Sequence, residues 1–150
     1  MLAAIKQFFD RLAADGDVDM GEDEVRLAVA ALLYHVIAVD GVVSPAESAL
    51  LRQLLRKHFD LDPWSAESLA KAAATADEEA VDLYHFTSLL KQRLEAEDRE
   101  RIIEMMWRLV YADGGVHEFE ENVVWRVAEL LAVSSPVRIR LKQVARNETE

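Results

Sequence analysis

Two acidic turns hold the residues of this sequence whose types and spacing could do chemistry. Each turn has the pattern Asp-Gly-x-Val-x-x-x-Glu, and the second copy follows the first at an offset of 73 residues, from Asp40 to Asp113. Glu47 closes the first copy and Glu120 closes the second. Hard cations such as Ca²⁺ and Mg²⁺ prefer several oxygen ligands, and each turn offers carboxylates together with backbone carbonyls. The two turns together could therefore bind a divalent cation.

Local structural roles are also open to the same carboxylates. Glu47 follows Ser44 by three residues, so it can complete a capping box at the start of a helix, and Glu120 can do the same for His117. The two aspartates can bond backbone groups in their own turns, and the glycines after them can end a helix in the left-handed conformation. A transition metal bound with help from His35 or His117 is a third interpretation. The residues by themselves leave all three open.

The elements that position these turns are predicted to be helices. Apolar residues recur with the helical period along most of the chain, and no segment alternates long enough to predict a strand. We therefore expect an all-α fold, a compact bundle of seven to eight helices. Predicted helices cover a segment near the N-terminus (about 1–12), then about 22–39, a segment from 45, 65–76, a segment capped by 77–79, 97–112, 118–131 and a last segment to about 146.

Length and composition limit the number of domains and the possible functions of the chain. The chain has 150 residues, 51% of them hydrophobic, and its formal net charge is −11. We expect a single domain over 1–150, with helix–turn–helix repeats at about 22–59 and 97–132. The negative charge disfavours a nucleic-acid binder. The absence of cysteine excludes disulfides, thiolate metal sites and a cysteine nucleophile.

The sequence predicts neither a catalytic centre nor a membrane segment. The sequence has no His-Glu-x-x-His, Gly-x-Ser-x-Gly or phosphate-binding loop motif. No apolar run approaches the roughly 20 residues that cross a bilayer, and the N-terminus does not resemble a signal peptide. We expect a cytoplasmic protein that is not an enzyme.

Several other residue groups have structural interpretations. His35 is expected in the core, and His58 and His85 on helix surfaces. The three tryptophans are expected in the core or in grooves, where an exposed one could anchor a partner. A C-terminal group of basic residues is expected to lie against the acidic body, with recognition of an acidic partner as the alternative; it comprises Arg138, Arg140, Lys142 and Arg146.

The paired turns resemble those of the TerB-like family, which includes tellurite-resistance TerB proteins and a domain of some membrane-anchored DnaJ co-chaperones. The resemblance implies a bundle of about seven helices with the two turns close together. It also implies a divalent-cation site formed by Asp40, Glu47, Asp113 and Glu120. The copies differ, because Ser44-Pro45 in the first becomes His117-Glu118 in the second, so the two turns need not be equivalent.

These observations predict a non-enzymatic TerB-like module that binds a protein partner in a stress response of the tellurite-resistance type. A divalent cation, with Ca²⁺ or Mg²⁺ favoured, would bind at the Asp-Gly turns. The alternatives are a metal-dependent hydrolase that uses the same carboxylates and a purely structural adaptor without metal. A homo-oligomer is compatible with the sequence, whereas thiol-based reduction of tellurite is not expected without cysteine.

Overall fold

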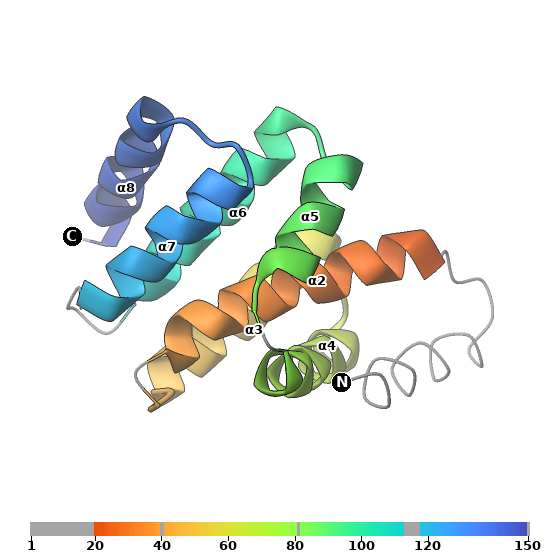
Figure 1. Ribbon diagram of the computed structural model, residues 1–150. Helices are drawn as coiled ribbons and strands as arrows, with labels where there is room; N and C mark the ends of the chain where they lie inside the picture. Colours follow the sequence, from red (N-terminus) through yellow and green to blue (C-terminus); the bar gives the residue numbers. More distant parts are fainter. Residues whose placement is uncertain (1–19, 40, 81, 113–117, 150) are drawn as a thin grey trace.

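The described part of the chain is built from helices (Figure 1). The computed structural model describes residues 20–39, 41–80, 82–112 and 118–149, and these ranges contain no strand. The helices are α2 (Met20–Ala38), α3 (Pro45–Phe59), α4 (Pro63–Glu79), α5 (Tyr84–Arg93), α6 (Ala96–Val110), α7 (Glu118–Leu130) and α8 (Ser135–Thr149). The predicted all-α bundle is confirmed. The helix predicted near the N-terminus lies outside the described residues.

Helix α2 is the central element of the bundle. Every residue from Leu27 to Leu33 is buried, as are Val36 and Ile37. A helix that is apolar on all sides must be covered on all sides, and α2 contacts α3, α4, α5, α6 and α7. Figure 1 shows α2 crossing the molecule, with α4 on one side and α6, α7 and α8 on the other. None of the described helices is both long and apolar enough to cross a membrane.

Small side chains line the most extensive helix–helix contact, which joins α2 and α4. Ala30 and Ala31 of α2 are fully buried, and so are Ala66, Ala73 and Ala76 of α4. The distance between packed helix axes depends on the size of the side chains at the contact. Alanine-rich helices can therefore pack closely at the centre of the fold.

The basic C-terminal helix lies against acidic residues, as the sequence predicted. Helix α8 packs mainly on α6, and Lys142 Nζ lies 2.6 Å from Glu121 Oε1 of α7. Arg140 and Glu100 approach to 3.6 Å. These pairs connect α8 to two other helices of the bundle.

Helix α3 begins with the predicted capping box. The Glu47 N–H donates to Ser44 Oγ at 3.1 Å, and the Ser44 N–H donates to Glu47 Oε1 at 2.9 Å. Pro45 occupies the first helical turn, where its missing N–H costs nothing. At the other end Asp60 adopts the left-handed conformation with φ of 53°, and its N–H donates to the Arg56 carbonyl. Both ends of α3 are therefore set by local chemistry.

Replacing Ser44 by alanine is expected to lower the free energy of unfolding by about 1 kcal/mol, because the N-cap acceptor is lost. Urea unfolding followed by circular dichroism measures the change. Ser44→Asp is the matched control, since aspartate also accepts at the N-cap, and it should keep most of the stability. An alanine variant as stable as the native chain would contradict this role.

One predicted helix start is wrong. The sequence predicts that residues 77–79 cap the helix after α4, but they form the last turn of α4, and α5 begins at Tyr84. Acidic residues favour the start of a helix over its end, which is why the sequence pointed to an N-terminus. In the structure Asp77 Oδ1 lies 2.7 Å from His35 Nδ1 of α2. This tertiary contact offsets the unfavourable position of Asp77 at a helix end.

Candidate functional site

The first acidic turn connects α2 to α3 and brings Glu47 into the protein interior. Gly41 has a φ of 86°, a conformation that glycine adopts without strain, and its N–H donates to the Ala38 carbonyl at 2.9 Å. The chain therefore leaves α2 in the left-handed turn that the sequence predicted. Glu47 follows in the first turn of α3 and is only 3% exposed.

The second acidic turn precedes α7, whose first turn contains Glu118, Glu120 and Glu121. A helix N-terminus favours negative charge, so this helix accommodates its acidic start. Glu120 is 2% exposed, nearly the same value as that of its equivalent Glu47. Glutamate is rarely buried to this extent. The two repeats therefore place a buried carboxylate at the same point, one turn into the second helix of each pair.

The structure places only part of the predicted cation site. Asp40 and Asp113 lie outside the described residues, as does His117. Within the ranges that are described, no three histidine, aspartate or glutamate side chains gather in a way that could hold a metal ion. The first turns of α3 and α7, which hold Glu47 and Glu120, lie toward the same side of the molecule in Figure 1. The capping role of Glu47 is confirmed, whereas a cation ligand role stays a prediction.

The histidines occupy three different environments. His35 is half-buried and its Nδ1 bonds Asp77, so it is a partnered residue at the edge of the core. His85 is exposed, as predicted. His58 was expected on a helix surface, but it is half-buried. Burial lowers the pKa of His58, and the positive charge of Arg101 lowers it further.

The tryptophans are not all internal. Trp107 of α6 is fully buried, in agreement with the prediction, but Trp64 is exposed. Trp125 of α7 is 47% exposed and lies beside a cavity of about 250 Å³ that Trp107 and Tyr111 also line. Trp64 therefore contradicts the expectation of a core or groove position.

Aromatic and basic side chains line this cavity, which lies between α6, α7 and α8. Arg138 of α8 is 4% exposed, and its guanidinium carbon lies 3.6 Å from the centre of the Trp125 ring. Lys142, one turn further along α8, lies 5.2 Å from the centre of the Trp107 ring. Stacking of a cation on an aromatic face is attractive because the ring face is electron-rich. Sequence reasoning missed this cavity, although the spacing of Arg138, Lys142 and Arg146 predicts one cationic stripe on α8.

Comparisons with known proteins agree with this architecture. A family model described as tellurite resistance protein TerB matches residues 26–143. A crystal structure of a protein of unknown function from Porphyromonas gingivalis W83 superposes with a TM-score of 0.62 and 15% identity. The match covers 87% of this chain and 98% of that one. At this identity the likeness shows a shared fold alone. A comparison with curated proteins found no match.

Proposed function

Because the chain belongs to the TerB family, we propose that it is a non-catalytic module that binds a divalent cation at its two acidic turns and docks onto a protein partner. The process would be a stress response of the tellurite-resistance type. The proposed ligands are the side chains of Asp40, Glu47, Asp113 and Glu120. Ca²⁺ and Mg²⁺ are the favoured ions because all four ligands are carboxylates. The cytoplasmic location stays a prediction.

The burial of two equivalent glutamates is the observation that supports the cation site. Glu47 and Glu120 are 3% and 2% exposed. Moving a carboxylate out of water is costly unless its charge is compensated, and a bound divalent cation would compensate it. The capping box does not exclude this role, because an ionised carboxylate has two oxygens and about four acceptor positions.

The cavity between α6, α7 and α8 supports the proposed protein partner. Trp125 and Ile139 line it and are both exposed, and Arg138 adds positive charge, whereas the charge of Lys142 is paired with Glu121. Aromatic residues and arginine are enriched at protein interfaces, and lysine is depleted there. An acidic segment with an apolar side chain has the chemistry that fits this cavity.

Cation binding should raise the stability of metal-stripped protein. A site with a Kd of about 10 μM would add about 2.7 kcal/mol to the free energy of unfolding in about 1 mM free cation. Urea unfolding in Ca²⁺, in Mg²⁺ and in a monovalent salt of equal ionic strength measures this increase. Equal stability in all three solutions would contradict the cation site and favour the purely structural adaptor.

Activity assays on the same protein distinguish the proposed non-catalytic module from the alternative, a metal-dependent hydrolase. Phosphoester, peptide and ester substrates are incubated with the cation-loaded protein and again after chelation. The proposal predicts no turnover in either sample. Chelator-sensitive turnover would instead assign the carboxylates to a metal-dependent hydrolase.

A further inference from the structure

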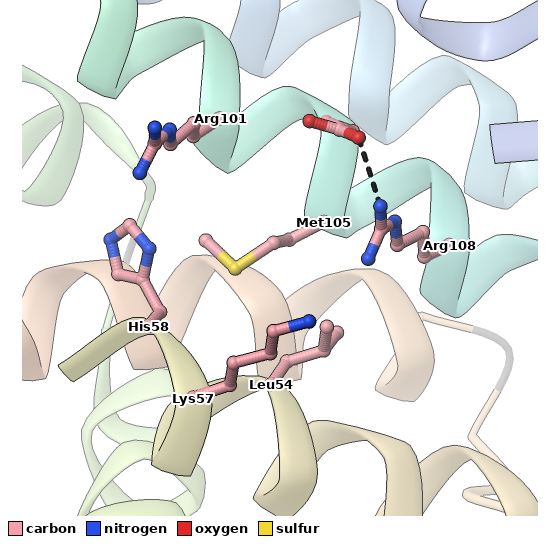
Figure 2. A pocket seen from close by; sticks show the side chains of 7 residues that line it. Leu54, Lys57, His58, Arg101, Met105 and Arg108 are labelled. Atoms are coloured by element: carbon pink, nitrogen blue, oxygen red, sulfur yellow. Dashed lines mark hydrogen bonds and ion pairs between the residues drawn. The ribbon is translucent and has the colours of Figure 1, made fainter. Parts of the chain in front are cut away.

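A cleft between α3 and α6 is lined by four basic residues and one carboxylate, that of Glu104, although the whole chain carries a net charge of −11. Its volume is about 380 Å³, within the range of small-molecule sites. Figure 2 shows the side chains around it. The basic residues that line it are Lys57, His58, Arg101 and Arg108.

Helical spacing explains how these residues come together. On α3, Lys57 and His58 follow Leu54 by three and four residues, so the three share one face. On α6, Met105 follows Arg101 by four residues, and Arg108 lies about two turns from Arg101, a rise of about 10 Å. The two helices contact each other, so these faces meet across the cleft.

The cleft has an apolar floor between two groups of polar side chains. Leu54 and Met105 both line it and are buried. In Figure 2 the Met105 side chain lies between His58 and Arg101 on one side and Arg108 on the other, with the Lys57 ammonium directed toward Arg108. A ligand with an anionic group and an apolar part would meet both kinds of surface.

The charges of the cleft are only partly balanced by the protein. Glu104 Oε1 lies 3.0 Å from Arg108 Nη2, and Glu148 Oε2 lies 2.7 Å from the same nitrogen, so the charge of Arg108 is compensated. Lys57 and Arg101 have no ion pair within the described part of the chain. These two charges are therefore available to an external anion.

The environment of His58 is consistent with the positive charge of Arg101 beside it. Its pKa is lowered first by burial and then by the charge of Arg101, and the negative charge of Asp98 opposes this only in part. A nearby positive charge such as that of Arg101 disfavours the protonated form of a histidine, because that form is itself positively charged. The Arg101 charge that contributes to this shift would also attract an anion.

We propose that the α3–α6 cleft binds a small molecule that carries more than one phosphate group, with Arg101 contacting phosphate oxygens at one end of the cleft, Lys57 contacting those toward the other end, and His58 as a further hydrogen-bonding partner. Phosphate is favoured over a carboxylate because its double charge gains more from two uncompensated cations. Arginine and lysine are also the side chains best suited to phosphate oxygens. Leu54 and Met105 would contact the apolar part of the molecule. This inference does not rest on the cation site, which uses different residues.

The test is calorimetric titration of metal-stripped protein with ADP and with inorganic pyrophosphate, in low salt with a chelator present. We expect binding with a Kd below about 1 mM for at least one probe. The double variant Lys57→Gln/Arg101→Gln should bind at least about tenfold more weakly, because two charged contacts are lost. Both side chains are exposed, so the variant should remain folded, and circular dichroism checks this.

Lys71→Gln/Arg140→Gln is the matched control, since it removes the same charge from two exposed residues outside the cleft. Its affinity should equal that of the native chain. Two results would overturn the proposal: no binding of either probe with a Kd below about 1 mM, or an equal loss of affinity in both double variants. The second result would show attraction by net charge alone.

Discussion

Replacement of Trp107 by alanine is expected to lower the free energy of unfolding by about 3–5 kcal/mol. Trp107 is fully buried in α6 and is among the largest buried side chains of the described residues. It supports two neighbours, because its ring centre lies 6.3 Å from that of Tyr111 and 5.2 Å from the Lys142 ammonium. Its loss removes buried apolar area and enlarges the adjoining cavity of about 250 Å³.

Urea unfolding of the variant and of the native chain measures this effect. Trp64→Ala is the matched control, because Trp64 is the exposed tryptophan of α4. The control should change the free energy of unfolding by no more than about 0.5 kcal/mol. Equal losses in the two variants would contradict the packing described for α6 and α8.

The double variant Glu47→Gln/Glu120→Gln is expected to weaken divalent-cation binding about 100-fold, since affinity depends on the number of charged ligands. Glutamine at the third helical position still accepts the hydrogen bond of a capping box. The substitution therefore removes the charge that a cation needs and keeps the local structure of α3. The cation-dependent increase in stability should disappear, while stability without cation should change little.

Glu67→Gln is the matched control for charge, because Glu67 is an exposed carboxylate of α4 that lies 3.7 Å from Lys71. It should respond to Ca²⁺ and Mg²⁺ as the native chain does. If the double variant also responds as the native chain does, the two buried glutamates do not bind the cation. A double variant that unfolds without cation would show that their charges are structural.

Elements governed by neighbouring residues could be predicted from the sequence. The Ser44, Pro45 and Glu47 pattern specified the start of α3, because every group in a capping box lies within one helical turn. The helical period of the apolar residues likewise predicted a helix over about 22–39, and α2 covers Met20–Ala38. The paired acidic turns indicated the TerB-like family through their residues and spacing alone, and the family match over residues 26–143 confirms it.

Features that depend on helix packing could not be predicted in the same way. The contact between His35 and Asp77 joins residues 42 positions apart, and Asp77 lies in the last turn of α4, beyond the expected end of that helix. The α3–α6 cleft also needs a helix crossing, which periodicity does not specify. Trp64 is exposed although tryptophan is usually well buried, because its position at the start of α4 faces solvent.

The most direct test of the cation site is calorimetric titration of Ca²⁺ and Mg²⁺ into metal-stripped protein. We expect saturable binding of about one ion per chain with a Kd in the micromolar range for at least one of these cations. That binding should be weakened in the folded Glu47→Gln/Glu120→Gln variant. No binding tighter than about 1 mM would contradict the cation site. The buried glutamates would then serve only to cap and pack their helices.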